Sequence, residues 1–299
     1  MNMQQKTNLH QQPMHSPSGA TTVQRLLPVV RKTVRVTVAV VFGLVMIFPL
    51  IWLLSGAFKP SGTLLMYPPT LFPETITLNN VRNVFLQAVP FQTYFMNSVL
   101  VSAFHVGGAV FLSAMMGYAL AKYEFPGKSI LFSVILLGML IPIQVLVVPM
   151  FLVVRDFGLL NTRAALVVPF IAHPLGAFLF RQYMLGVPSS VIESGRIEGA
   201  GEFRIFVQLF SPMVGPAFAA FAVVDFVHSW NGFVWPYVVL RDRSKFVLPI
   251  WLNQLIQDPY VRDQALILAA ALLTVIPAVI LFILFQRRFV AGFATTTEK

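Results

Sequence analysis

The 299-residue chain contains no cysteine and few charged residues. Without cysteine it can form neither a disulfide framework nor a thiolate metal site, and thiol redox chemistry is excluded. Charged residues make up only 11% of the chain, whereas soluble domains carry about 25%. Hydrophobic residues make up 57%, and the mean hydropathy is +0.77. The composition therefore predicts a polytopic membrane protein.

Long apolar runs are the main feature that the chain does contain. A bilayer core of about 30 Å requires about 20 consecutive apolar residues per helix. Five runs of about this length lack Asp, Glu, Lys and Arg, and a sixth carries one acid, Asp225. The runs are residues 36–54, 99–121, 130–154, 164–180, 212–235 and 265–285. We expect an all-α fold with six transmembrane helices, kinked at internal prolines that membrane helices tolerate.

No enzyme motif emerges from the polar residues. The five histidines show no His-x-x-x-His spacing, and we interpret those in the apolar runs as polar spots on buried helix faces. The fragment "FPGKS", residues 125–129, ends like a phosphate-binding loop, but Lys122 occupies the position where that loop needs glycine. Neither a zincin motif nor a nucleophile elbow is present.

The basic residues predict the orientation of the chain. Placing the amino terminus in the cytoplasm puts thirteen of the 21 Lys and Arg residues inside, among them the cluster from Arg31 to Arg35 before the first run. Both termini are therefore expected to be cytoplasmic. The first run is interpreted as a span, because its 35-residue lead is too long for a signal peptide. Residues 1–33 are predicted to be a disordered tail, residues 34–289 the transmembrane domain, and residues 290–299 a second cytoplasmic tail.

A glycine-rich polar segment, "ESGRIEGAG" at residues 193–201, lies in the loop 186–211 between the fourth and fifth runs. Ser190 and Glu193 have the spacing of a capping box, which predicts a helix start. Gly199 and Gly201 would each be costly in a helix interior, so we expect a short helix, a bend and a second helix. The apolar positions would form one stripe, comprising Ile192, Gly199, Phe203, Phe206 and Phe210.

Two surfaces could receive this loop. An amphipathic helix could rest on lipid headgroups, but such helices favour a polar face rich in Lys and Arg. This loop carries three glutamates beside only Arg196 and Arg204. A protein partner is the better interpretation.

The loop and five further motifs carry a family resemblance. The segment "ESGRIEGAGEFRIFVQLFSPMVGPAF" resembles the signature cytoplasmic loop of binding-protein-dependent ABC transporter permeases, with Glu193, Gly199, Ala200, Phe206 and Pro212 at matching positions. Other segments resemble the maltose and glycerol-phosphate branch of carbohydrate permeases. They are "NSVLVSAF" from Asn97, "GYALAKYEFPGK" from Gly117, "MLIPIQVLVVPMF" from Met139, "FLFRQYMLGVP" from Phe178 and "WNGFVWPYVV" from Trp230.

The resemblance implies a type I importer permease in the inner membrane of a bacterium. It implies that the loop is a coupling helix that docks on a separate ATPase dimer, which binds the ATP, so this chain needs no cofactor. A second permease subunit, in a heterodimer, and an external solute-binding protein that delivers a sugar are implied as partners. The candidate coupling residues are Ser190, Glu193, Gly199, Ala200, Phe203 and Phe206.

Candidate pathway residues lie in the fifth run: Asp225, His228 and Asn231. A charge near the middle of a span costs about 2.5–3.5 kcal/mol on insertion scales, so Asp225 should face a partner or a watery path. The alternative is a structural pair between Asp225 and His228 at i, i+3 spacing. A secondary transporter or channel not driven by ATP is the alternative function, although it would usually show internal repeats and more buried ionisable groups.

Overall fold

The computed structural model describes the backbone of residues 22–86, 91–261 and 263–294. Side chains are described for residues 31–86, 91–261 and 263–286. These residues form helices and connecting turns, and no strand occurs among them. The chain divides into two compact units, residues 1–52 and 53–299. Each unit is described by itself.

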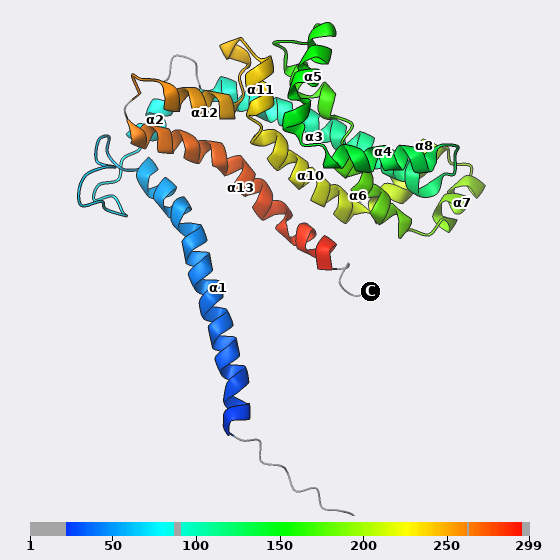
Figure 1. Cartoon of the computed structure of the whole chain (residues 1–299), viewed down its shortest axis with the longest axis horizontal. Coiled ribbons are helices and arrows are strands. Elements are labelled where there is room, and N and C mark those ends of the chain that lie inside the picture. Colours follow the sequence, from blue (N-terminus) through cyan, green and yellow to red (C-terminus); the bar gives the residue numbers. More distant parts are fainter. Residues whose placement is uncertain (1–21, 87–90, 262, 295–299) are drawn as a thin grey trace, which may run out of the picture. The chain divides into compact units, whose positions relative to one another are not determined.

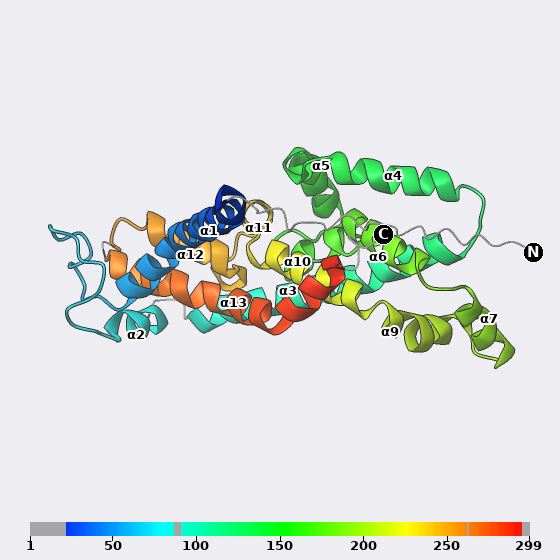
Figure 2. The same cartoon turned by 90° about the horizontal axis from the view of Figure 1, so that it is seen from below.

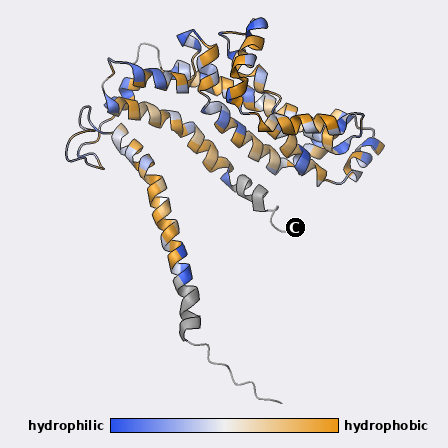
Figure 3. Ribbon diagram, in the orientation of Figure 1, coloured by the Kyte–Doolittle hydropathy of each residue, from blue (hydrophilic) through white to orange (hydrophobic). Residues whose placement is uncertain are grey.

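The first unit consists of α1 (Thr22–Ala57), which continues into the second unit. The most apolar 18-residue window within residues 31–57 of α1 has a mean hydropathy of 2.6, and the orange colour of this stretch shows the run (Figure 3). None of that window is buried. A helix that is apolar all round requires lipid or another chain around it. Residues 22–33, which the sequence analysis assigns to the tail, are helical within α1. Residues 1–21 of that tail lie outside the described residues.

The second unit contains the remaining helices (Figure 1). Two are long: α3 (Phe91–Lys122) and α13 (Gln264–Ala294). The others, in chain order, are α2 (Asn79–Phe85), α4 (Lys128–Leu140), α5 (Ile143–Asp156), η1 (Arg163–Leu166), η2 (Val168–Phe170), α6 (Pro174–Leu185), α7 (Ser190–Ile197), α8 (Glu202–Arg204), η3 (Ile205–Phe210), α9 (Ser211–Met213), α10 (Gly215–Trp230), α11 (Val234–Val239), η4 (Arg243–Lys245) and α12 (Leu248–Gln257).

Three described helices, α1, α3 and α13, are long and apolar enough to cross a membrane. Three bent pairs also qualify: α4 with α5 at 109°, η1 and η2 with α6 at 42°, and the α8–α9 segment with α10 at 85°. Counting each pair as one span gives six, and each predicted run falls on one of them. The all-α, polytopic fold is therefore confirmed.

Prolines explain where two of the bent spans break. Ile141 and Pro142 are extended between α4 and α5, and His173 is extended before Pro174 at the start of α6. The residue before proline is disfavoured in the helical region, so a helix tends to end there. Pro149 and Pro277 instead lie inside α5 and α13.

Helix α3 packs on α6 and α10, and α10 also packs on α13. The crossing of α3 and α6 is close at Gly117, where a Cβ atom would lie 2.5 Å from Cβ of Phe180 and 2.8 Å from the backbone nitrogen of Arg181. The buried core divides into two main groups. One surrounds Trp230 and Trp251, and the other lies beside α7.

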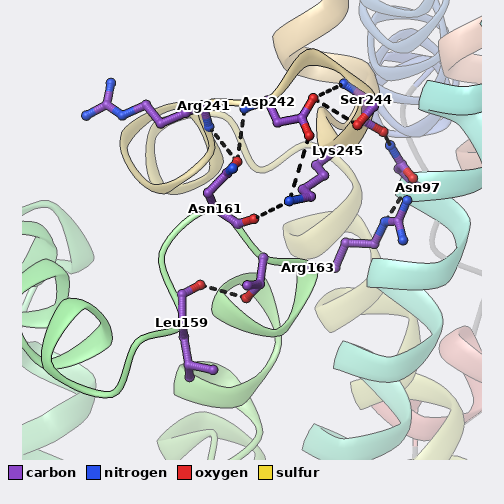
Figure 4. A network of polar contacts seen from close by, with 9 residues as sticks. Asn97, Leu159, Asn161, Arg163, Arg241, Asp242, Ser244 and Lys245 are labelled. Atoms are coloured by element: carbon purple, nitrogen blue, oxygen red, sulfur yellow. Dashed lines mark hydrogen bonds and ion pairs between the residues drawn. The ribbon is translucent and has the colours of Figure 1, made fainter.

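Side-chain hydrogen bonds of two asparagines, Asn97 and Asn161, link the interhelical turns at the end of the bundle that carries α12 (Figure 4). The Asn161 Oδ1 atom accepts the backbone N–H groups of Arg241 at 3.0 Å and Asp242 at 2.9 Å. The Asn97 Oδ1 atom accepts Arg163 Nε at 3.0 Å, while its Nδ2 donates to the Ser244 carbonyl at 2.8 Å. Asn161 adopts a φ of 57°, which asparagine tolerates better than most residues. These bonds tie the turn before η1 to η4 and to α3.

Candidate functional site

The loop between α6 and α10 has the predicted order of a short helix, a bend and a second helical segment. Helix α7 ends at Ile197, Gly201 is extended, and α8, η3 and α9 then run as one helical segment to Met213. Helices α7 and α9 lie at one end of the second unit (Figure 2). The candidate coupling residues therefore share one end of the bundle.

The predicted capping box is wrong. The helix begins one residue earlier than expected, with Ser189 as N-cap, and no side chain caps it. The N–H of Ile192 is taken by the Ser189 carbonyl at 2.9 Å, and the N–H of Glu193 by the same carbonyl at 3.2 Å. The Ser189 carbonyl thus already accepts the Glu193 N–H that a capping Ser190 side chain would bind, so Ser190 has no capping role. The Glu193 side chain is exposed within α7.

Gly199 lies after α7 and not inside a helix, in the bend that the sequence predicts. Its φ is +79°, the left-handed conformation that glycine adopts without steric cost. The N–H of Ala200 bonds to the Gly195 carbonyl at 2.9 Å, and the N–H of Gly199 bonds to the Arg196 carbonyl at 3.0 Å. These two bonds form a Schellman motif, which satisfies the last carbonyls of α7. No described atom lies within 4 Å of where a Gly199 Cβ would be, so this position is open to a partner.

The predicted apolar stripe is divided between the interior and the surface. Ile192, Phe206 and Phe210 are buried, while Phe203 is 60% exposed. The bend interrupts the 3.6-residue period, and η3 is a π-helix, in which backbone bonds span five residues. A partner could therefore contact Phe203, whereas Phe206 belongs to the core and Ala200 packs at its margin.

Aromatic contacts join this loop to the end of α3. The Tyr118 ring lies 5.2 Å from the Phe206 ring and 4.8 Å from the Phe210 ring, between centroids. Lys122 Nζ donates to the Val187 carbonyl and lies 5.5 Å from the centre of the Phe210 ring. The sequence placed Tyr118 only within a motif and assigned Lys122 only to the cytoplasmic basic residues.

A second connection is polar and was also missed. The Tyr123 hydroxyl donates to Glu202, and Arg196 Nε bonds to the other carboxylate oxygen of Glu202 at 2.7 Å. The Arg196 guanidinium and the Tyr123 hydroxyl lower the pKa of Glu202, so this carboxylate is ionised at neutral pH. Burial and the bond to Glu202 raise the pKa of Tyr123, which keeps the donor protonated. The three side chains therefore fix both halves of the loop to the turn after α3.

The fifth-run candidates have different environments from those predicted. Asp225 is 1% exposed, and its Oδ1 lies 3.5 Å from Nε2 of His105 on α3. The predicted pair between Asp225 and His228 is therefore wrong, because Asp225 faces α3 while His228 is exposed. Asn231 follows α10 and donates to the Val227 carbonyl at 3.0 Å. The three residues do not form one cluster.

A central cavity of about 180 Å³ lies beside this pair. His105 and His228 both line it, and the His173 ring lies 6.5 Å from the His228 ring. The lining comes from α3, α5, η1, η2, α10, α11 and the turn between the last two. Three histidines from separate runs thus lie near the only acid of the apolar runs. No group of three or more His, Cys, Asp or Glu suited to a metal ion occurs among the residues described.

Comparison with known proteins gives consistent results. The family model for the inner membrane component of binding-protein-dependent transport systems matches residues 109–294. The arabinooligosaccharides transport system permease protein AraQ of Halalkalibacterium halodurans is 41% identical over 82% of this chain and 88% of its own. The diacetylchitobiose uptake system permease protein NgcG of Streptomyces coelicolor is 33% identical over 87% and 86%.

More distant relatives extend the comparison. The sn-glycerol-3-phosphate transport system permease protein UgpE of Shigella flexneri is 28% identical over 83% of this chain and 90% of its own. A chain in the crystal structure of a bacterial ABC transporter involved in the import of the acidic polysaccharide alginate superposes with a TM-score of 0.78. It is 23% identical and covers 90% of this chain and 98% of its own, which shows a shared fold.

Removing the Tyr123 hydroxyl should loosen the loop. In Tyr123→Phe, the Glu202 carboxylate loses one donor, so amides of residues 196–204 should exchange with deuterium several-fold faster, with α6 unchanged. Tyr260→Phe, at a side chain that is 93% exposed, is the matched control and should leave exchange unaltered. Equal exchange in wild type and Tyr123→Phe would show that this bond does not hold the loop.

The pair of His105 and Asp225 should behave as one unit. Removing one partner leaves the other buried and unpaired, so Asp225→Val or His105→Leu alone should each cost about 3–5 kcal/mol in the free energy of unfolding. The double variant should cost clearly less than the sum. Denaturant unfolding in detergent measures all three, and strictly additive costs would contradict a coupled pair.

Proposed function

The chain belongs to the family of inner membrane components of binding-protein-dependent transport systems, and we propose that it couples ATP hydrolysis on a separate subunit to import of a sugar or sugar-like solute. It is a membrane-embedded transport subunit of the ABC type and not an enzyme. We further propose a second permease subunit as its partner in a heterodimer, a cytoplasmic ATPase dimer, and an extracytoplasmic solute-binding protein.

The loop geometry is the observation that carries the coupling proposal. Helix α7 ends in a Schellman motif at one end of the bundle (Figure 2). The loop that contains it is fixed to α3 through Tyr118 and Lys122, and to the turn after α3 through the bond between Tyr123 and Glu202. Force applied to α7 would therefore reach α3 through the rest of the loop, on which α7 packs. The outward-facing groups, Phe203 at 60% exposure and Ile197 at 87%, supply an apolar contact for an ATPase cleft.

The relatives support the solute class. Two of them are named for oligosaccharides, and this chain matches more than four fifths of each. The relative named for glycerol 3-phosphate is less similar. A secondary transporter or channel, the alternative function, is disfavoured by membership of a binding-protein-dependent family.

Uptake by the reconstituted assembly tests this function. Vesicles would contain this chain, its copurified permease partner and the ATPase, with the solute-binding protein outside. The panel would pair arabino-oligosaccharides and diacetylchitobiose, which are neutral, with glycerol 3-phosphate and an alginate disaccharide, which are anionic. We expect uptake of at least one sugar that requires both ATP and the binding protein. Uptake driven by an ion gradient without ATP would overturn the proposal.

The orientation of the chain across the membrane follows from the proposed coupling role, and it stays a prediction. If α7 meets a cytoplasmic ATPase, the α12 end is external and both termini are internal. Because the chain has no cysteine, single cysteines at Glu74 and Tyr260 should react with an impermeant thiol reagent from outside. Cysteines at Glu124 and Ser190 should react only in opened vesicles. Reversal at either pair would refute the topology.

Gly199 should be required for coupling in two separable ways. Gly199→Leu cannot adopt the left-handed conformation cheaply, whereas Gly199→Asn tolerates it but adds a side chain to the open surface. We expect both variants to lose binding-protein-stimulated ATPase activity by about tenfold or more while remaining in the membrane. Ser194→Ala, on the exposed face of α7, is the control and should retain activity.

The Gly199 pair also has an informative failure. Full stimulation in Gly199→Asn together with loss in Gly199→Leu would show that only the backbone conformation matters. Full stimulation and copurified ATPase in both would mean that the loop is not the coupling joint, and the lipid-surface interpretation would replace it.

A further inference from the structure

We propose that the central cavity is a solute subsite within this subunit and that it accepts a neutral, hydroxylated ring of the transported molecule. This inference rests on the proposed import function and adds the charge and the contact site of the solute. Its lining brings together the polar groups of Gln144, His228 and Ser229 and the aromatic rings of Phe170, Phe233 and Trp235.

The cavity lies at the depth where a translocation path must pass. His105 stands 14 residues after Phe91 in the 32-residue α3, which is about 21 Å along the helix at 1.5 Å per residue. The break between α4 and α5 brings Ile143 and Gln144 to the cavity, and the break between α10 and α11 brings Gly232 and Phe233. Non-helical backbone at membrane depth is tolerated where it is buried in protein or lines a cavity. Discontinuous helices around a midplane site are a known arrangement in transporters.

The lining offers what a sugar ring requires. A hydroxyl group both donates and accepts hydrogen bonds, and the side chains of Gln144, His228 and Ser229 can each do both. Gln144 and His228 are exposed within this chain, so their polar atoms are available. The apolar rings around them would contact the C–H faces of the solute, as in other small-molecule sites that combine apolar walls with a few polar groups.

The charge of the lining selects against anions. The residues that line the cavity include no Asp, Glu, Lys or Arg. The nearby acid, Asp225, is 1% exposed and pairs with His105, so it positions that imidazole without facing the solute. An anionic solute would lose hydration here without gaining a countercharge, and burying an unpaired charge is costly. A neutral ring pays no such penalty.

The size of the cavity limits what enters it. About 180 Å³ is less than the roughly 300–1,000 Å³ of pockets for whole drug-sized ligands. The cavity therefore accommodates one ring of an oligosaccharide, and the remaining rings would lie against the other permease subunit. A lipid chain or a partner side chain in the cavity is an outcome that the test separates.

Solute protection of single cysteines tests the subsite. In the reconstituted transporter with its binding protein and ATP, His228→Cys and Gln144→Cys would be alkylated with and without each panel solute, and labelling of this chain measured by mass. The transported neutral sugar should slow both reactions at least threefold. Val227→Cys and Val145→Cys are adjacent, exposed controls outside the cavity lining and should be unaffected.

The outcomes separate this inference from the proposed function. If wild type imports no sugar with ATP and binding protein, the proposed function fails. If import occurs but the cysteines at positions 228 and 144 are not protected from alkylation, or if anionic solutes protect them equally, only the subsite proposal fails. Cysteines at both positions that stay unreactive with and without solute would indicate that lipid or a partner side chain fills the cavity.

A charge substitution gives a second measurement should a cysteine variant fail to assemble. Gln144→Arg places a cation at the cavity, so it should lower the uptake ratio of neutral to anionic sugars at least tenfold. Gln144→Met, of similar length without charge, should reduce neutral uptake but leave that ratio unchanged. An unaltered ratio in Gln144→Arg would overturn the assignment of the cavity.

Discussion

The absence of water in the bilayer core is the constraint on which this structure depends. Backbone N–H and C=O groups there must find partners within the protein, so the chain crosses as helices and can depart from them only where other groups enclose it. The breaks at Pro142 and before Pro174 occur in spans that other helices contact, and the first of them opens onto the central cavity. Helix α1 satisfies its own backbone groups, but its most apolar window is not buried, so its apolar side chains depend on lipid or a partner for cover.

Helix α3 connects the two candidate functional regions of the second unit, the loop and the cavity. Near its middle, His105 contacts Asp225 and lines the cavity; at its end, Tyr118 and Lys122 contact the loop. The close crossing at Gly117 fixes the α3 backbone against α6 between these two regions. A continuous helix is stiff, so a displacement of its loop end would also displace the part of α3 that lines the cavity. The packing therefore places the proposed energy input and the proposed solute contact on a single element.

The sequence predicted the features that local pattern determines. Run length and charge gave the helical spans, and the two glycines after Glu198 gave the bend. It failed where the outcome depends on contacts between distant segments. The partner of Asp225 is His105, 120 residues away, and spacing along α10 could only suggest His228. The burial of Phe206 depends on Tyr118, and the capping role of Ser190 was lost because the helix started one residue earlier. Pairings across helices leave no periodic signal in one sequence.

The hydrogen bonds of Asn97 and Asn161 affect how quickly another protein could bind at the end of the bundle that carries α12. These two amides hold the turn before η1, η4 and the start of α3 in one arrangement. A surface whose loops are already ordered loses little conformational entropy when a partner arrives. Association there would be governed by diffusion and orientation instead of by loop folding, with association rate constants in the usual range of about 10⁵–10⁷ M⁻¹s⁻¹ for preformed patches.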